Sequence, residues 1–385
     1  MKVLFIAKNI PRPGRKGNKI ILTIAEKLSE FCDISILRPR EKVPFWLKHH
    51  PKYVDLVGLK EWETRNFKIT TFPYINIPFR KARYWLLFRL SKFGKEYIEN
   101  NKFDLIHAHY LFPDGQIAYH IKKIYEIPYV LTFRNQDKQY LELISTQNPD
   151  YYKASKIIRS AKQVLVPNSG YKDFVESNFN VSCSVMPHGI EQEAFLINHV
   201  VKGKKELTIL SVADKLPTKN VDWVIRGLKS YSGEQPVKLK LIGEVCNRED
   251  IIELSKHDER IELMGRIPRE EVLNYMKKSD IFALPSSKET FGLVYLEAAA
   301  TSNAIIGYRG EGVWGVFDEN EEMLFCENFE EFQSQLHSLL EDKNLGSKLA
   351  EKVHKKAKTM RWENVTKHYF AVYKNSINNT KRNDF

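Results

Sequence analysis

Two glutamates in the second half of the chain, Glu289 and Glu297, are the side chains whose spacing first indicates chemistry. At about 1.5 Å of rise per residue, the eight positions between them correspond to roughly 12 Å along a helix. Carboxylates that act together on one glycosidic bond lie roughly 5–9.5 Å apart, so this pair is spaced too widely for that reaction. The spacing instead suits one extended ligand that is held at two places through its hydroxyl groups.

The segments around the pair predict the elements that position it. The apolar run from Ile281 to Leu284 predicts a buried strand that ends at Pro285. From Phe291 to Thr301 the chain is rich in Leu and Ala and has no turn former after Gly292, which predicts a buried helix. Glu297 would then lie inside an apolar helix, where an unpaired charge costs several kcal/mol.

The first backbone amides of that helix have no earlier carbonyl to bond, which makes a helix N-terminus a ready anion site. Here the amides belong to Phe291, Gly292, Leu293 and Val294. Hydroxyl-binding ends around an anion-binding middle describe the chemistry of a nucleotide diphosphate sugar. A purely structural alternative stays open, in which Glu289 caps the helix and Glu297 pairs with a buried arginine or lysine.

Two other loops could meet the same phosphates. Lys219 lies between a predicted strand, Leu207 to Val212, and a predicted helix, Val221 to Leu228. Its ammonium group is a compact charge on a flexible stem and suits a diphosphate clamp, although lysines are common in loops. Gly17 lies in a basic loop after the strand Val3 to Ala7, where the backbone could approach phosphate, although the full Gly-x-Gly-x-x-Gly spacing is absent.

A strand predicted at Phe103 to Tyr110 ends in histidines. His107 and His109 are two positions apart and would face the same side of the strand. A metal site needs further ligands at recognisable spacing, and none stands out, so no metal ion or other cofactor is predicted. Open α/β sheets bind ligands at the carboxyl ends of their strands, which favours His109 as a pocket residue and His107 as a structural one.

The length of 385 residues and the repeated order of strand and helix predict two α/β domains. Each would contain a doubly wound, mostly parallel sheet. A polar, basic stretch at 197–206 has the composition of an interdomain linker. We therefore predict one Rossmann-like domain at 1–198 and a second at 199–361.

The net charge of +12 indicates an anionic partner. Basic and aromatic residues are interleaved around Arg80, Lys81, Arg83 and Trp85, a pattern that suits a membrane surface or single-stranded nucleic acid. The structural alternative is that the aromatics belong to the core and the cations to a solvated face. No nucleic-acid motif accompanies the pattern, so the functional prediction is contact with an anionic membrane and not with nucleic acid.

The compartment is predicted from cysteines and apolar runs. The four cysteines are scattered without a Cys-x-x-Cys pair, which fits a reducing compartment better than a disulfide framework or a zinc site. The first apolar run is too short for a signal peptide, and no stretch approaches the about 18 apolar residues of a membrane span. We expect a cytoplasmic protein with peripheral contact at the inner face of the cytoplasmic membrane.

Taken together, these motifs resemble the retaining glycosyltransferases of family 4, which have the GT-B fold. The resemblance covers the chain to about residue 376 and rests first on Pro-Ser-x-x-Glu-x-Phe-Gly…Glu-Ala, here Pro285 to Ala298. Supporting motifs follow the family's order. They are the Gly17 loop, His-Ala-His-Tyr at 107–110, Pro-His-Gly-Ile at 187–190 with Phe195 beyond, Phe325, and Trp362-Glu363.

The resemblance implies an architecture and a set of roles. The two Rossmann-like domains would face each other across a cleft, the first binding the acceptor and the second the nucleotide-sugar donor, and a C-terminal helix at 362–378 would cross back to the first. Glu289 would contact hydroxyls of the transferred sugar, and Glu297 the ribose. Lys219 and the helix amides would hold the diphosphate, with Gly17 closing over it. His109 would lie beside the reacting centre.

The sequence departs from the family's pattern on both sides of the expected site. Asp214 stands where the family usually has arginine, and Lys215 beside it is the candidate substitute in the donor clamp. Arg134-Asn135 replaces a usual His-Gly, whereas Asp137 fits the pattern. We assign Arg134 and Asp137, together with the basic and aromatic segment around residues 80–85, to acceptor binding or the membrane face. The departures leave the donor sugar and nucleotide unassigned.

The predicted activity is transfer of a hexose-type sugar from a nucleotide diphosphate sugar to a hydroxyl of a glycan or lipid-linked acceptor, in surface polysaccharide biosynthesis. The chain has no Asp-x-Asp pair, so we expect metal-independent catalysis. Retention without an obvious carboxylate nucleophile suggests front-face attack, which the sequence alone does not decide. The alternatives are a non-catalytic sugar- or nucleotide-binding protein on a decayed GT-B scaffold, and another GT-B enzyme such as a nucleotide-sugar epimerase or a phosphorylase.

Overall fold

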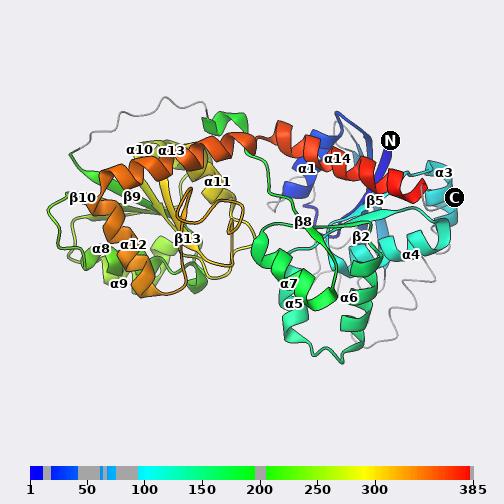
Figure 1. Cartoon of the computed structure of the whole chain (residues 1–385), viewed down its shortest axis with the longest axis horizontal. Helices are drawn as coiled ribbons and strands as arrows, with labels where there is room; N and C mark the ends of the chain where they lie inside the picture. The colour runs from blue at the N-terminus through cyan, green and yellow to red at the C-terminus, as the bar shows by residue number, and fades with distance from the viewer. Residues whose placement is uncertain (12–18, 42–60, 64–66, 75–93, 196–204, 382–385) are drawn as a thin grey trace. The chain divides into compact units, whose positions relative to one another are not determined.

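The computed structural model describes residues 1–11, 19–41, 61–63, 67–74, 94–195 and 205–381. The chain divides into two compact units (Figure 1). The first comprises Met1–Val166, Tyr171–Ser184 and Thr366–Phe385, and the second comprises Pro167–Gly170 and Val185–Val365. Each unit is built on its own sheet.

The first unit contains a sheet that has eight strands in the described part of the chain, in the order β3-β4-β2-β1-β5-β6-β7-β8. β3 runs antiparallel to β4, whereas β4, β2, β1, β5, β6 and β7 pair in parallel. The strands are β1 (Lys2–Ile6), β2 (Asp33–Glu41), β3 (Glu61–Glu63), β4 (Lys68–Tyr74), β5 (Leu105–Ala108), β6 (Tyr129–Thr132), β7 (Gln163–Val166) and β8 (Cys183–Val185). The helices between them are α1 (Ile20–Leu28), α3 (Glu99–Asn101), α4 (Gln116–Tyr125), α5 (Asn135–Leu143), α6 (Pro149–Ser160) and α7 (Ser169–Phe179).

The second unit contains a sheet of six described strands in the order β11-β10-β9-β12-β13-β14, all paired in parallel. The strands are β9 (Leu207–Val212), β10 (Val237–Ile242), β11 (Ile261–Gly265), β12 (Ile281–Ala283), β13 (Ala304–Tyr308) and β14 (Leu324–Cys326). The helices are α8 (Val221–Lys229), α9 (Glu249–Ser255), α10 (Arg269–Lys278), α11 (Leu293–Ala300), α12 (Phe329–Glu341) and α13 (Lys343–Thr359). No helix among the residues described is long and apolar enough to cross a membrane.

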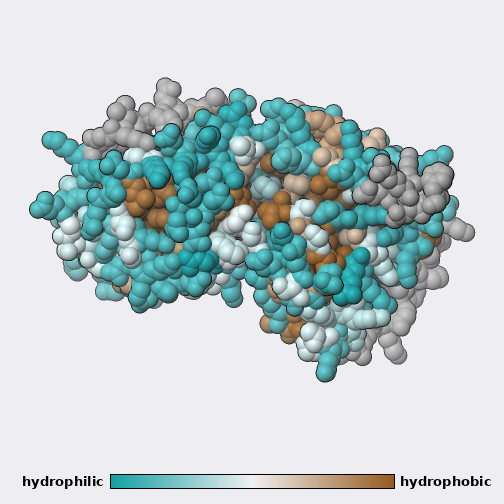
Figure 2. Space-filling model, in the orientation of Figure 1, coloured by the Kyte–Doolittle hydropathy of each residue, from teal (hydrophilic) through white to brown (hydrophobic). Residues whose placement is uncertain are grey.

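Both sheets are apolar because parallel strands covered by helices are buried on both faces. β5 in the first unit and β12 in the second are buried along their whole lengths. Figure 2 shows that the visible surface of both units is mostly hydrophilic, with smaller hydrophobic areas. The predicted pair of doubly wound, mostly parallel α/β domains is therefore confirmed.

The predicted boundary lies between residues 198 and 199, whereas the second unit of the structure contains Pro167–Gly170 and then continues from Val185. Ile190 forms a bridge with Arg361, which lies near the end of that unit. The ring of His188 packs edge-on against Phe291, with 4.7 Å between the centroids. These packing contacts attach the segment to the second unit, and the polar composition of the predicted linker does not reveal them.

The C-terminal helix, α14 (Trp362–Lys381), begins in the second unit and belongs to the first from Thr366 onward. In the first unit its Tyr373 hydroxyl lies 2.6 Å from Nδ1 of His107. Phe370 packs against Phe31, with 5.5 Å between the ring centroids. The C-terminal helix therefore packs on the first unit, as the family resemblance implies.

Candidate active site

The helix that carries Glu297 is α11, and it begins two residues later than the sequence predicts. It spans Leu293–Ala300, and Gly292 precedes it with φ of 71°. This left-handed conformation favours glycine, and a Cβ on Gly292 would lie 2.6 Å from the Tyr295 ring. The amides of Phe291 and Gly292 therefore precede the helix, whereas those of Leu293 and Val294 belong to its first turn, where helices attract anions.

Lys219 and Glu289, from two different strand-to-helix connections, lie in contact. Lys219 Nζ is 2.6 Å from Glu289 Oε2, and the two side chains are only 12% and 17% exposed. The side-chain amide of Asn220 donates to the carbonyl of Pro285 at 2.9 Å and joins the two connections. A desolvated ion pair of this kind is costly to break unless another charged group replaces one partner.

Lys215 does not join this contact. Its side chain is exposed, and no hydrogen bond or ion pair links it to another predicted site residue within the described ranges. The neighbouring Asp214 accepts the amide of Leu216 at 2.9 Å, which closes a local turn. The structure therefore gives no support to Lys215 as the substitute for the family's usual arginine.

Glu297 has a partner that the sequence analysis missed. Arg269, the first residue of α10, places its guanidinium 2.6 Å from Glu297 Oε1. Glu297 is 13% exposed, whereas Arg269 is 65% exposed. The structural alternative, in which Glu297 pairs with a buried arginine or lysine, is met only in part, because Arg269 lies largely in solvent. Surface ion pairs contribute little stability, so Glu297 can leave this exposed arginine and bind a hydroxyl-bearing ligand at small cost.

The backbone of Glu289 is fixed by the loop that follows β13. Its amide donates to Glu311 Oε2 at 3.1 Å, and its carbonyl accepts from the amide of Gly312 at 2.9 Å. Asn168, which is fully buried, donates its side-chain amide to the carbonyls of Gly312 at 2.7 Å and Thr290 at 3.1 Å. The sequence analysis did not identify Asn168 as a supporting residue, although its place just after strand β7 could have indicated one.

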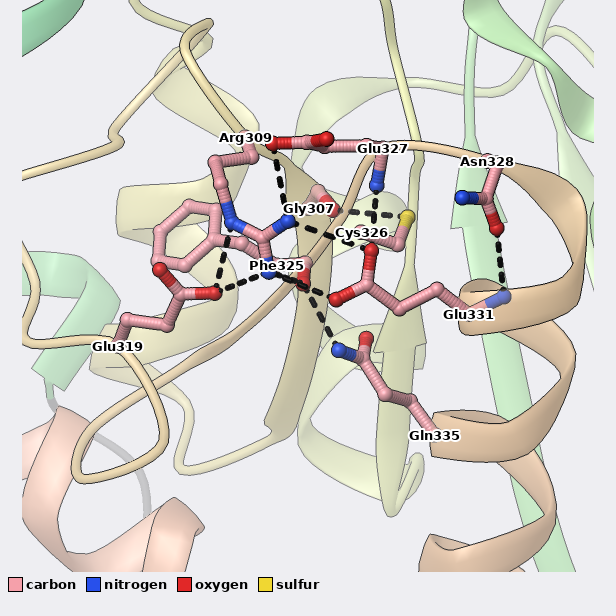
Figure 3. Close-up of polar contacts among 9 residues, drawn as sticks. All are labelled: Gly307, Arg309, Glu319, Phe325, Cys326, Glu327, Asn328, Glu331 and Gln335. Carbon is pink, nitrogen blue, oxygen red and sulfur yellow. Dashed lines mark hydrogen bonds and ion pairs between the residues drawn. The ribbon is translucent and has the colours of Figure 1, made fainter.

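Arg309, at the start of the loop that follows β13, forms ion pairs with a cluster of glutamates (Figure 3). Its guanidinium lies 2.5 Å from Glu319, 2.7 Å from Glu331 and 3.1 Å from Glu327. Hydrogen bonds to these carboxylates raise the pKa of Arg309 and lower that of Glu331. Figure 3 shows the guanidinium between the side chains of Glu319 and Glu331. The cluster therefore ties the loop that supports Glu289 to β14 and α12.

His109 lies just beyond the end of β5 in the first unit and is fully buried. Neither of its ring nitrogens has a hydrogen-bond partner. Burial lowers the pKa of His109 well below its ordinary value, and His107 and Arg134 lower it further. The ring is therefore neutral near pH 7 and has both a donor and an acceptor to offer.

His107 has the structural role that the sequence predicts. Its Nδ1 lies 2.6 Å from the hydroxyl of Tyr373 and its Nε2 lies 2.7 Å from the hydroxyl of Thr132. Burial, with Arg134 as a smaller cause, lowers the pKa of His107 to about 3. The neutral ring thus links β5 to both β6 and α14.

Arg134 and Asp137 lie at the end of β6 and the start of α5. Both are buried, at 6% and 5% exposure. Nε of Arg134 donates to the carbonyl of His109 at 3.1 Å, and the Asp137 carboxylate accepts the amides of Leu111 at 3.0 Å and Arg134 at 2.9 Å. Burial raises the pKa of Asp137 to about 7, although these hydrogen bonds and the charge of Arg134 each lower it. The structure therefore brings His109, Arg134 and Asp137 together.

A second buried acid, Asp114, was not predicted. It is fully buried, and its two oxygens accept the amide of Lys8 at 3.1 and 3.2 Å. Burial raises the pKa of Asp114 well above its ordinary value. Asp114 follows β5 by only a few residues, but nothing in its local sequence distinguishes it from an exposed loop acid.

Several predicted site residues lie outside the described residues. They are Gly17, Arg80, Lys81, Arg83 and Trp85. Within the part of the chain that the structure describes, no group of three or more His, Cys, Asp or Glu residues is placed to hold a metal ion.

Two Rossmann-like units that share a C-terminal helix define the GT-B class of glycosyltransferases. Family models match nearly the whole chain: the one described as Glycosyltransferase Family 4 covers residues 21–194, and the one described as Glycosyl transferases group 1 covers residues 193–360. The chain belongs to glycosyltransferase family 4 and is a glycosyltransferase.

Individual proteins are similar to this chain over most of its length. An uncharacterized glycosyltransferase of Methanocaldococcus jannaschii is 26% identical over 82% of this chain and 86% of its own. The N-acetyl-alpha-D-glucosaminyl L-malate synthase of Bacillus anthracis is 24% identical over 74% of this chain and 78% of its own. Anabaena HepE, solved in complex with UDP and glucose, has a TM-score of 0.64 at 14% identity and covers 97% of this chain and 100% of its own.

Proposed function

We propose that this glycosyltransferase moves a hexose-type sugar from a nucleotide diphosphate sugar to a hydroxyl of a glycan or lipid-linked acceptor, with retention of the anomeric configuration. The observation that carries the proposal is the 2.6 Å contact of Lys219 with Glu289 beside the start of α11, the helix that also carries Glu297. A cation, a helix N-terminus and two carboxylates suit a diphosphate that joins two hydroxyl-bearing groups.

A bound diphosphate would compete with Glu289 for Lys219, because it brings more than one negative charge to the ammonium group. Glu289 would then accept hydrogen bonds from hydroxyls of the transferred sugar. The amides of Leu293 and Val294 would donate to the diphosphate, and Glu297 would accept from the ribose. The complex of Anabaena HepE with UDP and glucose supports a donor of the UDP-sugar class.

In the proposed transfer the acceptor oxygen bonds to the anomeric carbon while the bond from that carbon to the diphosphate breaks. The electron pair of the broken bond leaves with the diphosphate, which also takes up the acceptor proton on the same face of the sugar. Lys219 and the helix amides stabilise the charge that develops on the diphosphate, a role worth about a hundredfold in rate for one donor. Because these groups supply that stabilisation, we propose that the reaction needs no metal ion.

His109 suits the acceptor side of this reaction. Its low pKa keeps the ring neutral, so it can hydrogen-bond a sugar hydroxyl without adding charge beside the reacting carbon. We place the acceptor in surface polysaccharide biosynthesis at the inner face of the cytoplasmic membrane, which the +12 charge supports.

A panel of nucleotide sugars, read by thermal shift, tests the donor assignment, since a ligand that binds only the folded state raises the melting temperature. The stabilising donor is then assayed for hydrolysis and transfer with and without EDTA, and the anomeric configuration of the product is read by NMR. We expect Glu289→Gln to lower donor turnover by about tenfold or more, because a hydroxyl-binding charge is lost. Glu262→Gln is the matched control, since Glu262 pairs with Lys240 at 2.5 Å on β11.

Three results would contradict the proposal: no stabilising nucleotide sugar, an inverted product, or equal turnover by Glu289→Gln and Glu262→Gln. Loss of transfer in EDTA would contradict only the metal-independent part.

A non-catalytic sugar- or nucleotide-binding protein is the second candidate. The observation in its favour is the exposed Lys215 beside Asp214, which leaves Lys219 without a second cation from the same loop. Donor binding that is tight but gives neither hydrolysis nor transfer on a broad acceptor panel would establish this alternative.

A further inference from the structure

The ends of β1, β5 and β6 in the first unit hold a buried guanidinium that the donor chemistry does not use. Arg134 is 6% exposed, and its Nε donates to the carbonyl of His109 at 3.1 Å. Its Nη2 is buried and has no hydrogen-bond partner, and the same holds for both ring nitrogens of His109. Two adjacent buried side chains therefore have unused hydrogen-bonding atoms.

Unused polar atoms at such a place point to a ligand, because nearly all buried polar groups in proteins are hydrogen-bonded. The guanidinium cannot lose its charge and presents its N–H groups in a planar fork that matches carboxylate and phosphate oxygens. A neutral sugar hydroxyl would satisfy one N–H of Arg134 but would add no negative charge beside the buried guanidinium.

The carboxylates near Arg134 already have other partners. The oxygens of Asp137 accept the amides of Leu111 and Arg134, and those of Asp114 accept the amide of Lys8. Their raised pKa values also reduce the negative charge that they present near neutral pH. The side chain of Arg134 is therefore only partly compensated by these acids.

The start of α5 adds further donors beside Arg134. α5 has nine residues, and the amides of Asn135 and Gln136 at its first turn donate to no atom among the residues described. Amides at a helix N-terminus favour an anion. Gln136 is exposed and Asn135 half-buried, so this end of the group is open to solvent.

We propose that Arg134, the first amides of α5 and the ring of His109 bind an oxyanion, a phosphate monoester or a carboxylate, that belongs to the sugar acceptor. The identification of the ligand as the acceptor rests on the proposed function, whereas the oxyanion site itself does not. The acceptor class is then a hydroxyl compound that carries a phosphate or carboxylate group.

The test of the site uses the full chain saturated with UDP, so that added phosphate cannot occupy the diphosphate site. Inorganic phosphate is titrated and its affinity measured by calorimetry. We expect saturable binding that Arg134→Gln weakens by about tenfold or more, as for loss of a charge-assisted hydrogen-bonding fork. Arg159→Gln is the matched control, because Arg159 lies in the same unit and donates its Nε to the carbonyl of Phe179 at 3.0 Å. Its effect should stay within about twofold.

Two further measurements guard against a folding defect. Arg134→Lys keeps the charge but not the planar fork and should give an intermediate affinity. In the unsubstituted protein, the ¹⁵N signals of the His109 ring should shift with phosphate and saturate at the same concentration. Absence of saturable binding, an unshifted His109 signal, or equal effects of Arg134→Gln and Arg159→Gln would overturn the site.

Two acceptor pairs test the identity of the ligand and its source. Glycerol 3-phosphate is compared with glycerol, and lysophosphatidic acid with monoacylglycerol, each lipid held in phosphatidylcholine vesicles, in transfer assays with the donor found above. Preference for the anionic member of the first pair identifies a soluble acceptor, and the same preference in the second pair identifies a lipid acceptor. Equal transfer to both members in both pairs overturns the acceptor assignment. Failure of every nucleotide sugar in the panel to bind would instead contradict the proposed function, and the phosphate titration without UDP would still decide the site.

Discussion

At the scale of single residues, burial works in opposite directions on the acids and the histidines of the first unit. It raises the pKa of Asp137 to about 7 and lowers that of His107 to about 3. In both cases the neutral form is favoured, because a charge loses solvation in the interior. The two histidines are therefore neutral near pH 7, whereas the guanidinium of Arg134 beside them keeps its charge.

These shifts predict how stability depends on pH. His107 has an unfolded pKa of 6.5 and a folded pKa of about 3. As pH falls below 6.5, His107 is protonated in the unfolded chain but stays neutral in the folded protein, so the free energy of unfolding falls by about 1.4 kcal/mol per pH unit. His107→Gln removes this loss together with the hydrogen bonds to Tyr373 and Thr132. Its cost in unfolding free energy should therefore be about 1.4 kcal/mol smaller at pH 5.5 than at pH 7.5.

Urea unfolding followed by circular dichroism at the two pH values measures this difference. Asp137 acts with the opposite sign, since its raised pKa makes stability fall as pH rises from 3.8 to about 7. That slope is present in both proteins and cancels in the comparison. A cost of His107→Gln that does not change with pH would contradict the buried, neutral state of this ring.

At the scale of elements, the contact of Lys219 with Glu289 depends on how three loops converge near the start of α11. Lys219 comes from the connection before α8, Glu289 from the connection after β12, and Glu311 and Gly312 from the loop after β13. Arg309 anchors the last of these loops through three glutamates. None of the loops could position Glu289 by itself.

The turn into α11 gives a prediction for Gly292→Ala. Its φ of 71° costs an L-residue about 1–2 kcal/mol, and its Cβ would also lie 2.6 Å from the ring of Tyr295. That ring is buried, and its hydroxyl donates to the carbonyl of Leu284 at 2.5 Å, so it cannot easily move. We expect Gly292→Ala to cost more than the backbone strain alone and to weaken donor binding.

Gly265→Ala is the control for this prediction. Gly265 has a similar φ of 66°, but a Cβ there would meet nothing within 4 Å. Its cost in denaturant unfolding should therefore be limited to the backbone strain. Equal costs for the two substitutions would show that the steric contact with Tyr295 is relieved.

At the scale of the whole molecule, the net charge of +12 predicts attraction to anionic lipid. We expect the protein to sediment with vesicles that contain anionic lipid and not with neutral vesicles. Charge reversal at Arg80, Lys81 and Arg83 should reduce this binding and shift it to lower salt, because the attraction is electrostatic. Charge reversal at Lys343, Lys348 and Lys355 of α13 is the matched control. Equal sedimentation of the two charge-reversed variants would contradict a role for the segment around residues 80–85.

The sequence by itself determined the two α/β units and the family. Strand and helix periodicity is local, and the Pro285 to Ala298 motif fits its strand, loop and helix into one short stretch. The start of α11 was predicted two residues early, because helix propensity does not reveal the left-handed conformation of Gly292. The compact units of the structure divide at Val185, before the predicted linker, because contacts such as Ile190 with Arg361 join distant parts of the chain.

Only the tertiary structure decided which charges meet. It paired Glu289 with Lys219 and Glu297 with Arg269, left Lys215 in solvent, and buried Arg134 beside His109. The partner of a charge and its degree of burial depend on loops from separate strands that meet at the edge of a sheet, and no local pattern encodes that meeting. Chemistry that follows from residue type was therefore predictable, whereas pKa values and unused hydrogen-bond donors required the fold.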